Sequence, residues 1–247
     1  MAGRVQEIVC RGGWMRAVVV LRDEIEPSFD AEEIHLLVLE NGTGGRAISE
    51  KGEMRAMARD KIRAIRRAEK LFERFEEFYN VSGLSIAFDR FEDELIHAVE
   101  SLGAEVVYFF TSMPLPERLL SENVTLVFPR GGLSFNKALY VHSSSTPNTA
   151  WLERAKELFI LAIVQPTMPP EASSRKFREE FERMERETEE LSSHLKAERA
   201  VIRGNIVEDT LRYSEKHGAD TIFLNRGLGK ENIEKIVERA KASVVVV

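Results

Sequence analysis

The sequence is short of the features that mark disulfide-bonded, membrane-spanning and metal-bound proteins. Cys10 is the single cysteine among 247 residues, so no disulfide can form within the chain and cysteine cannot supply a metal cluster. None of the five histidines stands at metal-ligand spacing from another. No run approaches the ~18 consecutive apolar residues of a membrane span, and the first residues lack the apolar core of a signal peptide. We therefore expect a soluble, cytoplasmic protein that contacts no membrane.

The chain also lacks any basic stretch interleaved with aromatic residues. Its formal net charge is −6, because 41 Asp and Glu outnumber 35 Lys and Arg. This balance argues against a nucleic-acid partner. Hydrophobic residues make up 43% of the chain and charged residues 31%, which is enough apolar material for a core and excludes disorder. The length allows one large domain or two of ordinary size.

Two segments of the chain are alike in pattern. DELIHAVESLGAEVVYFF (93–110) matches EDTLRYSEKHGADTIFLN (208–225). Each copy predicts a helix that ends at a glycine, Gly103 or Gly218, followed by a buried strand. Helix–glycine–strand units are common, so a chance match is the alternative to an internal duplication.

Further correspondences in the same order favour duplication. An Arg-Gly-Gly triplet precedes an apolar run in both halves, at 11–13 and at 130–132. The other matching apolar runs are 34–40 with 159–165, 84–89 with 199–204, and 124–128 with 243–247. We therefore predict two similar domains, 1–131 and 132–247, of which the first is the more degenerate.

The helices expected between these strands differ between the halves. Apolar stripes predict long amphipathic helices over about 50–79 and 174–197. A further helix is expected within 142–158, with Thr146 as N-cap and Pro147 as its first residue. The equivalent stretch of the first half, 22–33, is short, so we expect that helix to be shortened or missing there.

Strands that alternate with helices predict the α/β class, here as two similar open parallel sheets with helices on both faces. The closing strands of the two halves, 124–128 and 243–247, are apolar and need cover at the sheet edge. We expect these two strands, or helices near them, to pair the halves with each other.

The second half resembles the universal stress protein family. ALYVHSSSTPNTAWLERAKEL (138–158) looks like the family's first strand, turn and helix, and FILAIVQPTMPPE (159–171) like its second strand. RAVIRGNIVEDTLRYSEKHGADTIFLNRG (199–227) and KASVVVV (241–247) resemble the strands and helix that complete the domain. The first half matches more faintly, through 83–128. The resemblance implies a tandem universal stress protein with a Rossmann-like fold, similar to the adenine nucleotide alpha hydrolases.

The resemblance also implies an ATP site at the carboxyl ends of the strands, and this sequence departs from the family there. The position of the family's aspartate is His142, and the first loop glycine is replaced by Leu224. The loop after Gly227 is shorter than in the family, and its Gly-Ser/Thr pair becomes roughly Lys230-Glu231. A glutamate beside phosphate is repulsive. We therefore predict a degraded ATP site.

Two glycines between an apolar run and a helix could still cradle an anion. The turn 225–231 is interpreted as structural, with Gly227 or Gly229 at positive φ. The alternative is a nucleotide or anion site built from the turn 141–146 and the loop 225–231. Its candidate residues are His142, Ser143, Ser144, Asn225, Gly227, Gly229 and Lys230.

We therefore expect a non-enzymatic stress-response or regulatory protein that contacts other proteins, forms a homodimer and has no resident cofactor. The first alternative binds ATP or another adenine nucleotide. The second is an enzyme on the same type of sheet, for which His142 beside three serines is the candidate chemistry. Neither a P-loop lysine motif nor a G-x-S-x-G elbow is present to support that enzyme.

Overall fold

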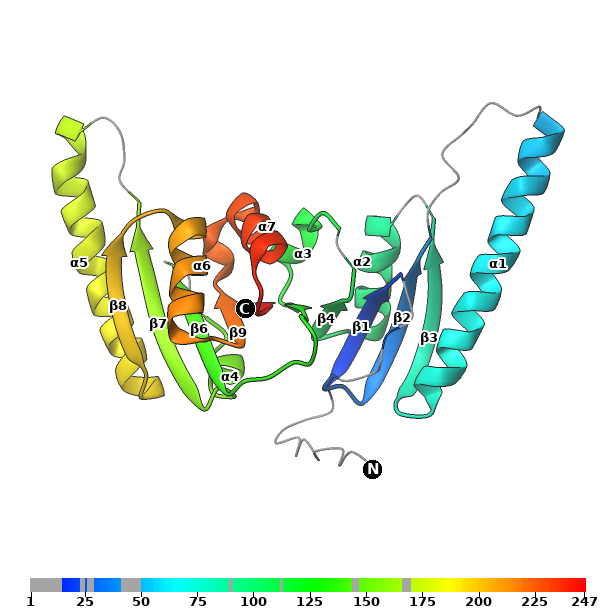
Figure 1. Cartoon of the computed structure of the whole chain (residues 1–247), viewed down its shortest axis with the longest axis horizontal. Helices are drawn as coiled ribbons and strands as arrows, with labels where there is room; N and C mark the ends of the chain where they lie inside the picture. The colour runs from blue at the N-terminus through cyan, green and yellow to red at the C-terminus, as the bar shows by residue number, and fades with distance from the viewer. Residues whose placement is uncertain are drawn as a thin grey trace. The chain divides into compact units, whose positions relative to one another are not determined.

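The computed structural model describes residues 15–22, 25, 29–40, 50–88, 91–111, 113–143, 147–165 and 170–247, with side chains from 59 and from 175 onward in the two long helices. The chain divides into two compact units, Met1–Thr111 and Ser112–Val247 (Figure 1). This division comes earlier in the chain than the repeat boundary expected at 131/132.

The first unit is an all-parallel sheet with strand order β3-β2-β1-β4. Its strands are β1 (Arg16–Leu21), β2 (Glu33–Leu39), β3 (Asn80–Ala87) and β4 (Val106–Phe109). Its helices are α1 (Glu50–Glu76) and α2 (Phe91–Leu102). Successive residues of β1 and β4 are buried. Because neighbouring side chains of a strand point to opposite faces, both faces of this sheet are covered.

The second unit has strand order β5-β10-β9-β6-β7-β8. Its strands are β5 (Thr125–Phe128), β6 (Lys137–His142), β7 (Glu157–Val164), β8 (Glu198–Arg203), β9 (Thr221–Leu224) and β10 (Ser243–Val246). Its helices are α3 (Glu117–Ser121), α4 (Thr149–Leu152), α5 (Pro170–Leu195), α6 (Ile206–His217), the 3₁₀ turn η1 (Arg226–Leu228) and α7 (Lys230–Arg239).

The strand order repeats, since β3-β2-β1-β4 in the first unit corresponds to β8-β7-β6-β9 in the second. The predicted glycine helix ends are confirmed, with φ of +60° at Gly103 and +61° at Gly218. The residue after each glycine donates back into its helix, Ala104 N to Val99 O at 3.0 Å and Ala219 N to Ser214 O at 2.9 Å. The two units therefore share local geometry as well as topology.

The predicted pairing of the closing strands is also confirmed. β5 and β10 pair antiparallel, with Val127 opposite Val245. All four residues of each strand are buried. This pairing explains why β5, which closes the first repeat in the sequence, belongs to the second compact unit.

The helix expected within 142–158 was predicted too long. α4 covers only Thr149–Leu152, and its N-cap is Asn148 rather than Thr146, which lies outside the described residues. The chain turns soon after Trp151, whose side chain is buried. The guanidinium carbon of Arg154 lies 4.7 Å from the centre of the Trp151 ring. Strand hydrogen bonding then begins by Lys156, whose N–H donates to the carbonyl of Phe135.

The missing helix of the first unit is tested only in part. Residues 22, 25 and 29–33 form no helix, and the rest of that connection lies outside the described residues. The Arg-Gly-Gly triplet at 11–13 lies outside them as well.

Candidate ligand site

The candidate residues gather where β6 and β9 end. These strands are parallel neighbours, with Val141 opposite Leu224, so the residues that follow them meet at one edge of the sheet. Asn225 N donates to the carbonyl of Val141 at 3.2 Å. Of the predicted set, Ser144 lies outside the described residues.

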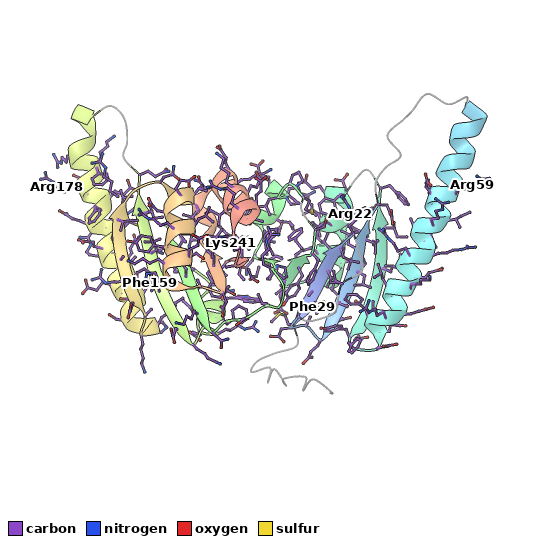
Figure 2. All side chains as sticks on the ribbon, viewed as in Figure 1. Arg22, Phe29, Arg59, Phe159, Arg178 and Lys241 are labelled. Carbon is purple, nitrogen blue, oxygen red and sulfur yellow. The ribbon has the colours of Figure 1, made fainter. Side chains whose placement is uncertain are left out.

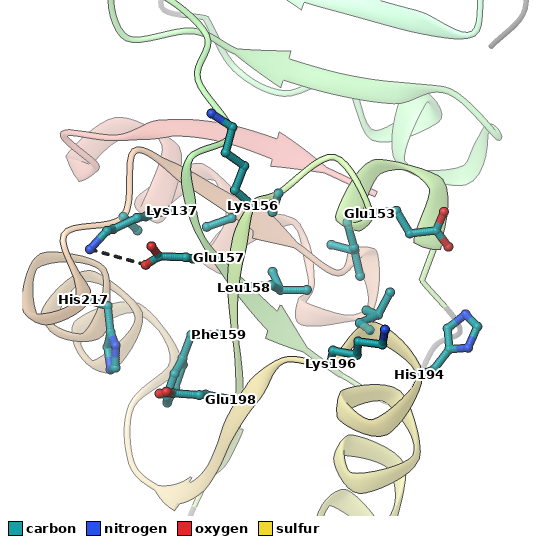
Figure 3. Close-up of a pocket in the computed structure, with 15 residues that line it drawn as sticks. Lys137, Glu153, Lys156, Glu157, Leu158, Phe159, His194, Lys196, Glu198 and His217 are labelled. Carbon is teal, nitrogen blue, oxygen red and sulfur yellow. Dashed lines mark ion pairs between the residues drawn. The ribbon is translucent and has the colours of Figure 1, made fainter. Parts of the chain in front are cut away.

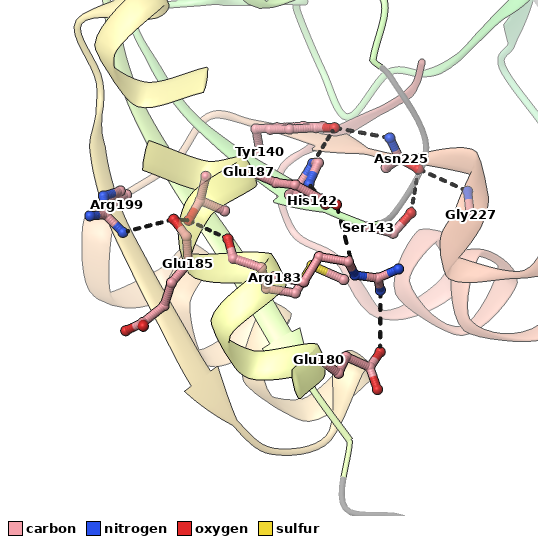
Figure 4. Close-up of polar contacts among 12 residues, drawn as sticks. Tyr140, His142, Ser143, Glu180, Arg183, Glu185, Glu187, Arg199, Asn225 and Gly227 are labelled. Carbon is pink, nitrogen blue, oxygen red and sulfur yellow. Dashed lines mark hydrogen bonds and ion pairs between the residues drawn. The ribbon is translucent and has the colours of Figure 1, made fainter. Parts of the chain in front are cut away.

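Asn225 is the centre of this group and is fully buried. Its Oδ1 accepts hydrogen bonds from Ser143 Oγ and from Gly227 N, the latter at 2.9 Å. Its Nδ2 donates to the hydroxyl of Tyr140 at 3.0 Å (Figure 4). One amide side chain therefore holds the end of β6 in place. The same side chain is the N-cap of η1, because it accepts the hydrogen bond from Gly227 N.

A chain of hydrogen bonds continues from Asn225 to α5. The Tyr140 hydroxyl lies 3.3 Å from His142 Nδ1, and His142 Nε2 lies 3.0 Å from Glu187 Oε2. The Tyr140 oxygen accepts from Asn225 and can donate its own proton to His142 Nδ1. That arrangement assigns the proton of a neutral His142 ring to Nε2, which faces Glu187.

Burial shapes the chemistry of this chain. Burial raises the pKa of Tyr140, an effect that the hydrogen bond from Asn225 offsets only in part, so the phenol remains a hydrogen-bond donor. His142 is 6% exposed and Ser143 is 8% exposed. His142 makes its two ring contacts with Tyr140 and Glu187, whereas Ser143 donates to Asn225. The histidine and serine therefore do not form a base–nucleophile pair.

Sequence reasoning missed Tyr140 and Glu187. Tyr140 could have been found, because residues two apart on a strand share a face and His142 was already a candidate. Nothing in the sequence distinguishes Glu187 from the other glutamates of α5, and its role depends on how that helix packs on the sheet.

Arg226 is a cation of the 225–231 loop, and its guanidinium donates hydrogen bonds to backbone carbonyl groups. It donates to the carbonyls of Leu119 at 3.0 Å and Leu120 at 3.1 Å, and also to those of Glu122 and Val124. These carbonyls end α3 and lead into β5, so Arg226 caps a helix C-terminus. Burial lowers the pKa of Arg226, although the nearby Glu122 acts in the opposite direction.

The loop ends at Gly229, which has φ of +81° as predicted for one of the two glycines. An added Cβ there would meet nothing within 4 Å, so the glycine is required by conformation and not by space. Gly229 is the N-cap of α7 and offers no side-chain acceptor. Lys230 Nζ lies 4.0 Å from Glu234 Oε1, which also accepts from Leu115 N at 2.9 Å.

Two of the surface hollows in this unit lie at the ends of its strands. One of about 440 Å³ adjoins the loop and is lined by Gly227, Asn148 and the segment between α3 and β5. The other, of about 560 Å³, lies at the opposite, amino ends of β6 and β7 (Figure 3). Its lining mixes lysines and glutamates, with Lys137 and Glu157 paired at 3.4 Å, so it favours neither sign of ligand charge.

Comparison with known proteins identifies the fold. No family model matches the chain. A universal stress protein from Archaeoglobus fulgidus DSM 4304 is 17% identical with a TM-score of 0.53, covering 93% of this chain and 95% of that one. The chain has a universal stress protein fold. A functionally unknown protein from Pseudomonas aeruginosa PAO1 is also similar, at 14% identity and a TM-score of 0.52, covering 95% and 92% of the two chains.

Among the residues that the structure describes, no helix is long and apolar enough to span a bilayer. Within the same residues, no group of three or more histidine, cysteine, aspartate or glutamate side chains is arranged to hold a metal ion.

Proposed function

We propose that this chain is a regulatory protein of the universal stress protein type, non-enzymatic and acting through contacts with other proteins. In this proposal the former ATP site has become a structural brace. The observation that supports it is the buried Asn225, whose side chain bonds Ser143, Gly227 and Tyr140. The polar groups that would face a nucleotide are therefore already hydrogen-bonded to one another.

Opening this brace for a ligand would be unfavourable. A buried polar group left without a partner costs about 1–3 kcal/mol, and several groups would have to separate at once. Arg226, a cation of the 225–231 loop, could contact a phosphate only by leaving the carbonyls that end α3. The binding energy of a nucleotide would first have to offset these losses.

The alternative is an adenine nucleotide or anion site that uses the 141–146 turn and the 225–231 loop. One observation favours it. The N-cap of α7 has no side-chain hydrogen bond, and the first N–H groups of a helix attract anions. Lys230, at the start of α7, has a side chain that is 38% exposed. In the main proposal water solvates these groups.

The proposal also includes two tandem copies of the domain, a homodimer, a cytoplasmic location and no resident cofactor. The recurring strand order and the matching helix ends at Gly103 and Gly218 support the tandem copies. The homodimer, the location and the lack of a cofactor follow from the resemblance to the family and from the sequence.

The nucleotide content of the purified protein tests this proposal. Protein purified without added nucleotide is denatured, and the supernatant is analysed by mass spectrometry. A known amount of ATP, added to a second sample before denaturation, controls for recovery. We expect adenine nucleotide far below one molecule per chain. About one ATP, ADP or AMP per chain would contradict the proposal and favour the alternative.

A further inference from the structure

Four cations lie in one line along the outer side of α1. Arg59, Arg63, Arg66 and Lys70 follow one another at intervals of four, three and four residues. Residues three and four apart share a face of a helix, and all four side chains are exposed. In Figure 2 the side chain of Arg59 points away from the sheet that α1 covers. These four residues form a cation stripe about 16 Å long, given the rise of an α-helix.

The cations of the stripe have no partner in their own unit. None of the four makes an ion pair or a side-chain hydrogen bond with another described residue. Arg67, which is partly buried, differs from them. Its Nη2 lies 2.7 Å from Glu40 Oε1 and 3.3 Å from the carbonyl oxygen of Leu39. The unit therefore pairs this cation and leaves the four outer ones to solvent.

Acidic residues of α1 border the stripe without pairing with it. Glu69 and Glu73 are exposed and stand three residues after Arg66 and Lys70. On a helix, a cation followed by a glutamate pairs less favourably than the reverse order. Like charges four residues apart, which occur twice within the stripe, oppose helix formation. The stability of α1 therefore does not explain the stripe.

The second unit provides an internal comparison. In the chain, α5 lies between β7 and β8 as α1 lies between β2 and β3. Met184 and Thr188 are buried on α5 as Ala64 and Ala68 are on α1. When these residues are matched, the positions of the stripe hold both signs of charge on α5: Glu179, Arg183, Arg186 and Glu190.

Two of these four α5 residues are paired within their own helix. Glu179 lies 2.8 Å from Arg175, and Arg183 lies 3.8 Å from Glu187. The same place in the fold can therefore carry balanced and paired charges. A line of unpaired cations is a property of α1 and not a requirement of the fold.

The neighbours of the stripe favour a protein helix as its ligand. A flat anionic membrane laid on this side of α1 would meet Glu69 and Glu73 as well as the cations, and like charges repel. A helix, about 10 Å wide, can follow the cations alone. Ile62 stands between Arg59 and Arg66 and is 51% exposed. An apolar side chain of a protein can cover it, whereas a nucleic acid finds no aromatic ring in the stripe for its bases to stack on.

We propose that the cation stripe of α1 is the docking surface for an acidic helix of a partner protein. The carboxylates of that helix repeat the spacing of the stripe, and an apolar side chain beside them contacts Ile62. Because the spacing reads the same in both directions, the two middle carboxylates meet Arg63 and Arg66 whichever way the partner helix runs. The inference rests on the proposed function in taking another protein as the partner.

Binding of a synthetic helical peptide to the full chain tests the proposal. The matched peptide, of about 18 residues, carries four glutamates at the spacing of the stripe and one leucine beside them, in a background of alanine and glutamine. A rearranged peptide of the same composition spreads its glutamates around the helix. Fluorescence anisotropy of the labelled peptides measures the binding of each.

The expected affinity follows from the size and charge of the surface. One helix face buries less than the ~1,200 Å² typical of stable interfaces. The matched peptide should therefore bind with a dissociation constant of roughly 10–100 µM at about 0.05 M salt. The rearranged peptide should bind at least about tenfold more weakly. Binding of the matched peptide should weaken as salt rises to about 0.5 M, because its contacts are exposed charges.

Charge reversal on the chain locates the site. Arg63→Glu with Arg66→Glu should weaken binding of the matched peptide at least about tenfold. The control on α5, Arg178→Glu with Arg186→Glu, changes the net charge equally and should leave binding within about twofold. A peptide with lysines at its two middle acidic positions should recover binding to the α1 variant. Circular dichroism checks that every variant is folded.

Three results would overturn the proposal. The first is no binding of the matched peptide, or equal binding of the matched and rearranged peptides. The second is equal loss of binding, or none, in the α1 and α5 variants. The third is tighter binding of phosphatidylserine vesicles or of a single-stranded RNA, lost in the α1 variant, which would assign the stripe to that ligand. None of these results depends on the nucleotide content of the chain, so this inference and the proposed function can fail separately.

Discussion

Asn225 shows how one side chain can fix the end of one strand and the loop that follows its neighbour. Its amide serves the ends of two strands and the first turn of η1 at the same time. Three groups therefore depend on it: Ser143 Oγ, Gly227 N and the Tyr140 hydroxyl. Each would need a new partner if the amide were removed.

We expect Asn225→Ala to lower the free energy of unfolding by about 3 kcal/mol, because it leaves buried polar groups unsatisfied and opens a small cavity. Asn232→Ala is the matched control, since its Nδ2 makes a single hydrogen bond to Leu228 O at 2.8 Å and its loss should cost about 1 kcal/mol. Urea unfolding followed by circular dichroism measures both. Equal effects of the two changes would show that Asn225 is not a brace.

For single residues, the sequence predicted where a side chain lies better than which side chains it contacts. Ser143 and Asn225 were expected near each other because each follows a buried strand. Their hydrogen bond, between residues 82 apart in the chain, depends on β6 and β9 being neighbours. The contact of His142 with Glu187 depends in addition on the rotation of α5 about its axis. No local pattern specifies that rotation.

Among the elements, the β2–β3 pair contains a titratable group in a confined position. His35 Nε2 lies 2.9 Å from Ser85 Oγ across the two strands. Gly83 lies beneath the ring, since an added Cβ would come within 2.3 Å of His35 Nδ1. Burial lowers the pKa of His35 below 6.5, and the charge of His97 acts in the same direction.

This shift predicts that acid destabilises the first unit. The unfolded chain binds a proton at His35 more readily than the folded chain, so stability is present above about pH 6.5 and is lost as the pH falls below it. The urea concentration at the unfolding midpoint should therefore be lower at about pH 5.5 than at about pH 7.5. The fall should be smaller in His35→Gln, which cannot titrate. An equal fall in both proteins would assign the effect to other groups.

The elements show where local pattern is a good guide. The long helices were predicted within a few residues, because a stripe of apolar residues repeated over many turns has only one regular solution. α4 was predicted too long because Thr146 and Pro147 resemble a helix start. The burial of Trp151 and the hydrogen bond from Lys156 to Phe135 end that helix early, and both depend on contacts distant in sequence.

At the scale of the whole molecule, the repeat in the sequence and the compact units are different divisions. The recurring strand order follows the repeat. The compact division follows hydrogen bonding, and it assigns β5 to the second unit because β5 pairs with β10. Sequence similarity could predict the repeated order and the partner of β5. It could not predict which unit would hold the strand.

We propose that this fold has kept the loop at 225–231 and lost the nucleotide. Relative to the family that the sequence resembles, the site lacks an aspartate, a loop glycine, much of the phosphate arm and its hydroxyl. If each loss removed about 1 kcal/mol, binding would weaken roughly a thousandfold. Such losses are only approximately additive.

Calorimetric titration of ATP with Mg²⁺ into the wild-type protein tests this claim most directly. We expect no saturable heat and a dissociation constant weaker than about 1 mM. The double variant Gly227→Asp with Gly229→Asp serves as the comparison, because its carboxylates would repel phosphates at the loop. It should resemble the wild type in this titration. A micromolar dissociation constant for the wild type, lost in a folded double variant, would contradict the account and show that the loop is a working phosphate site.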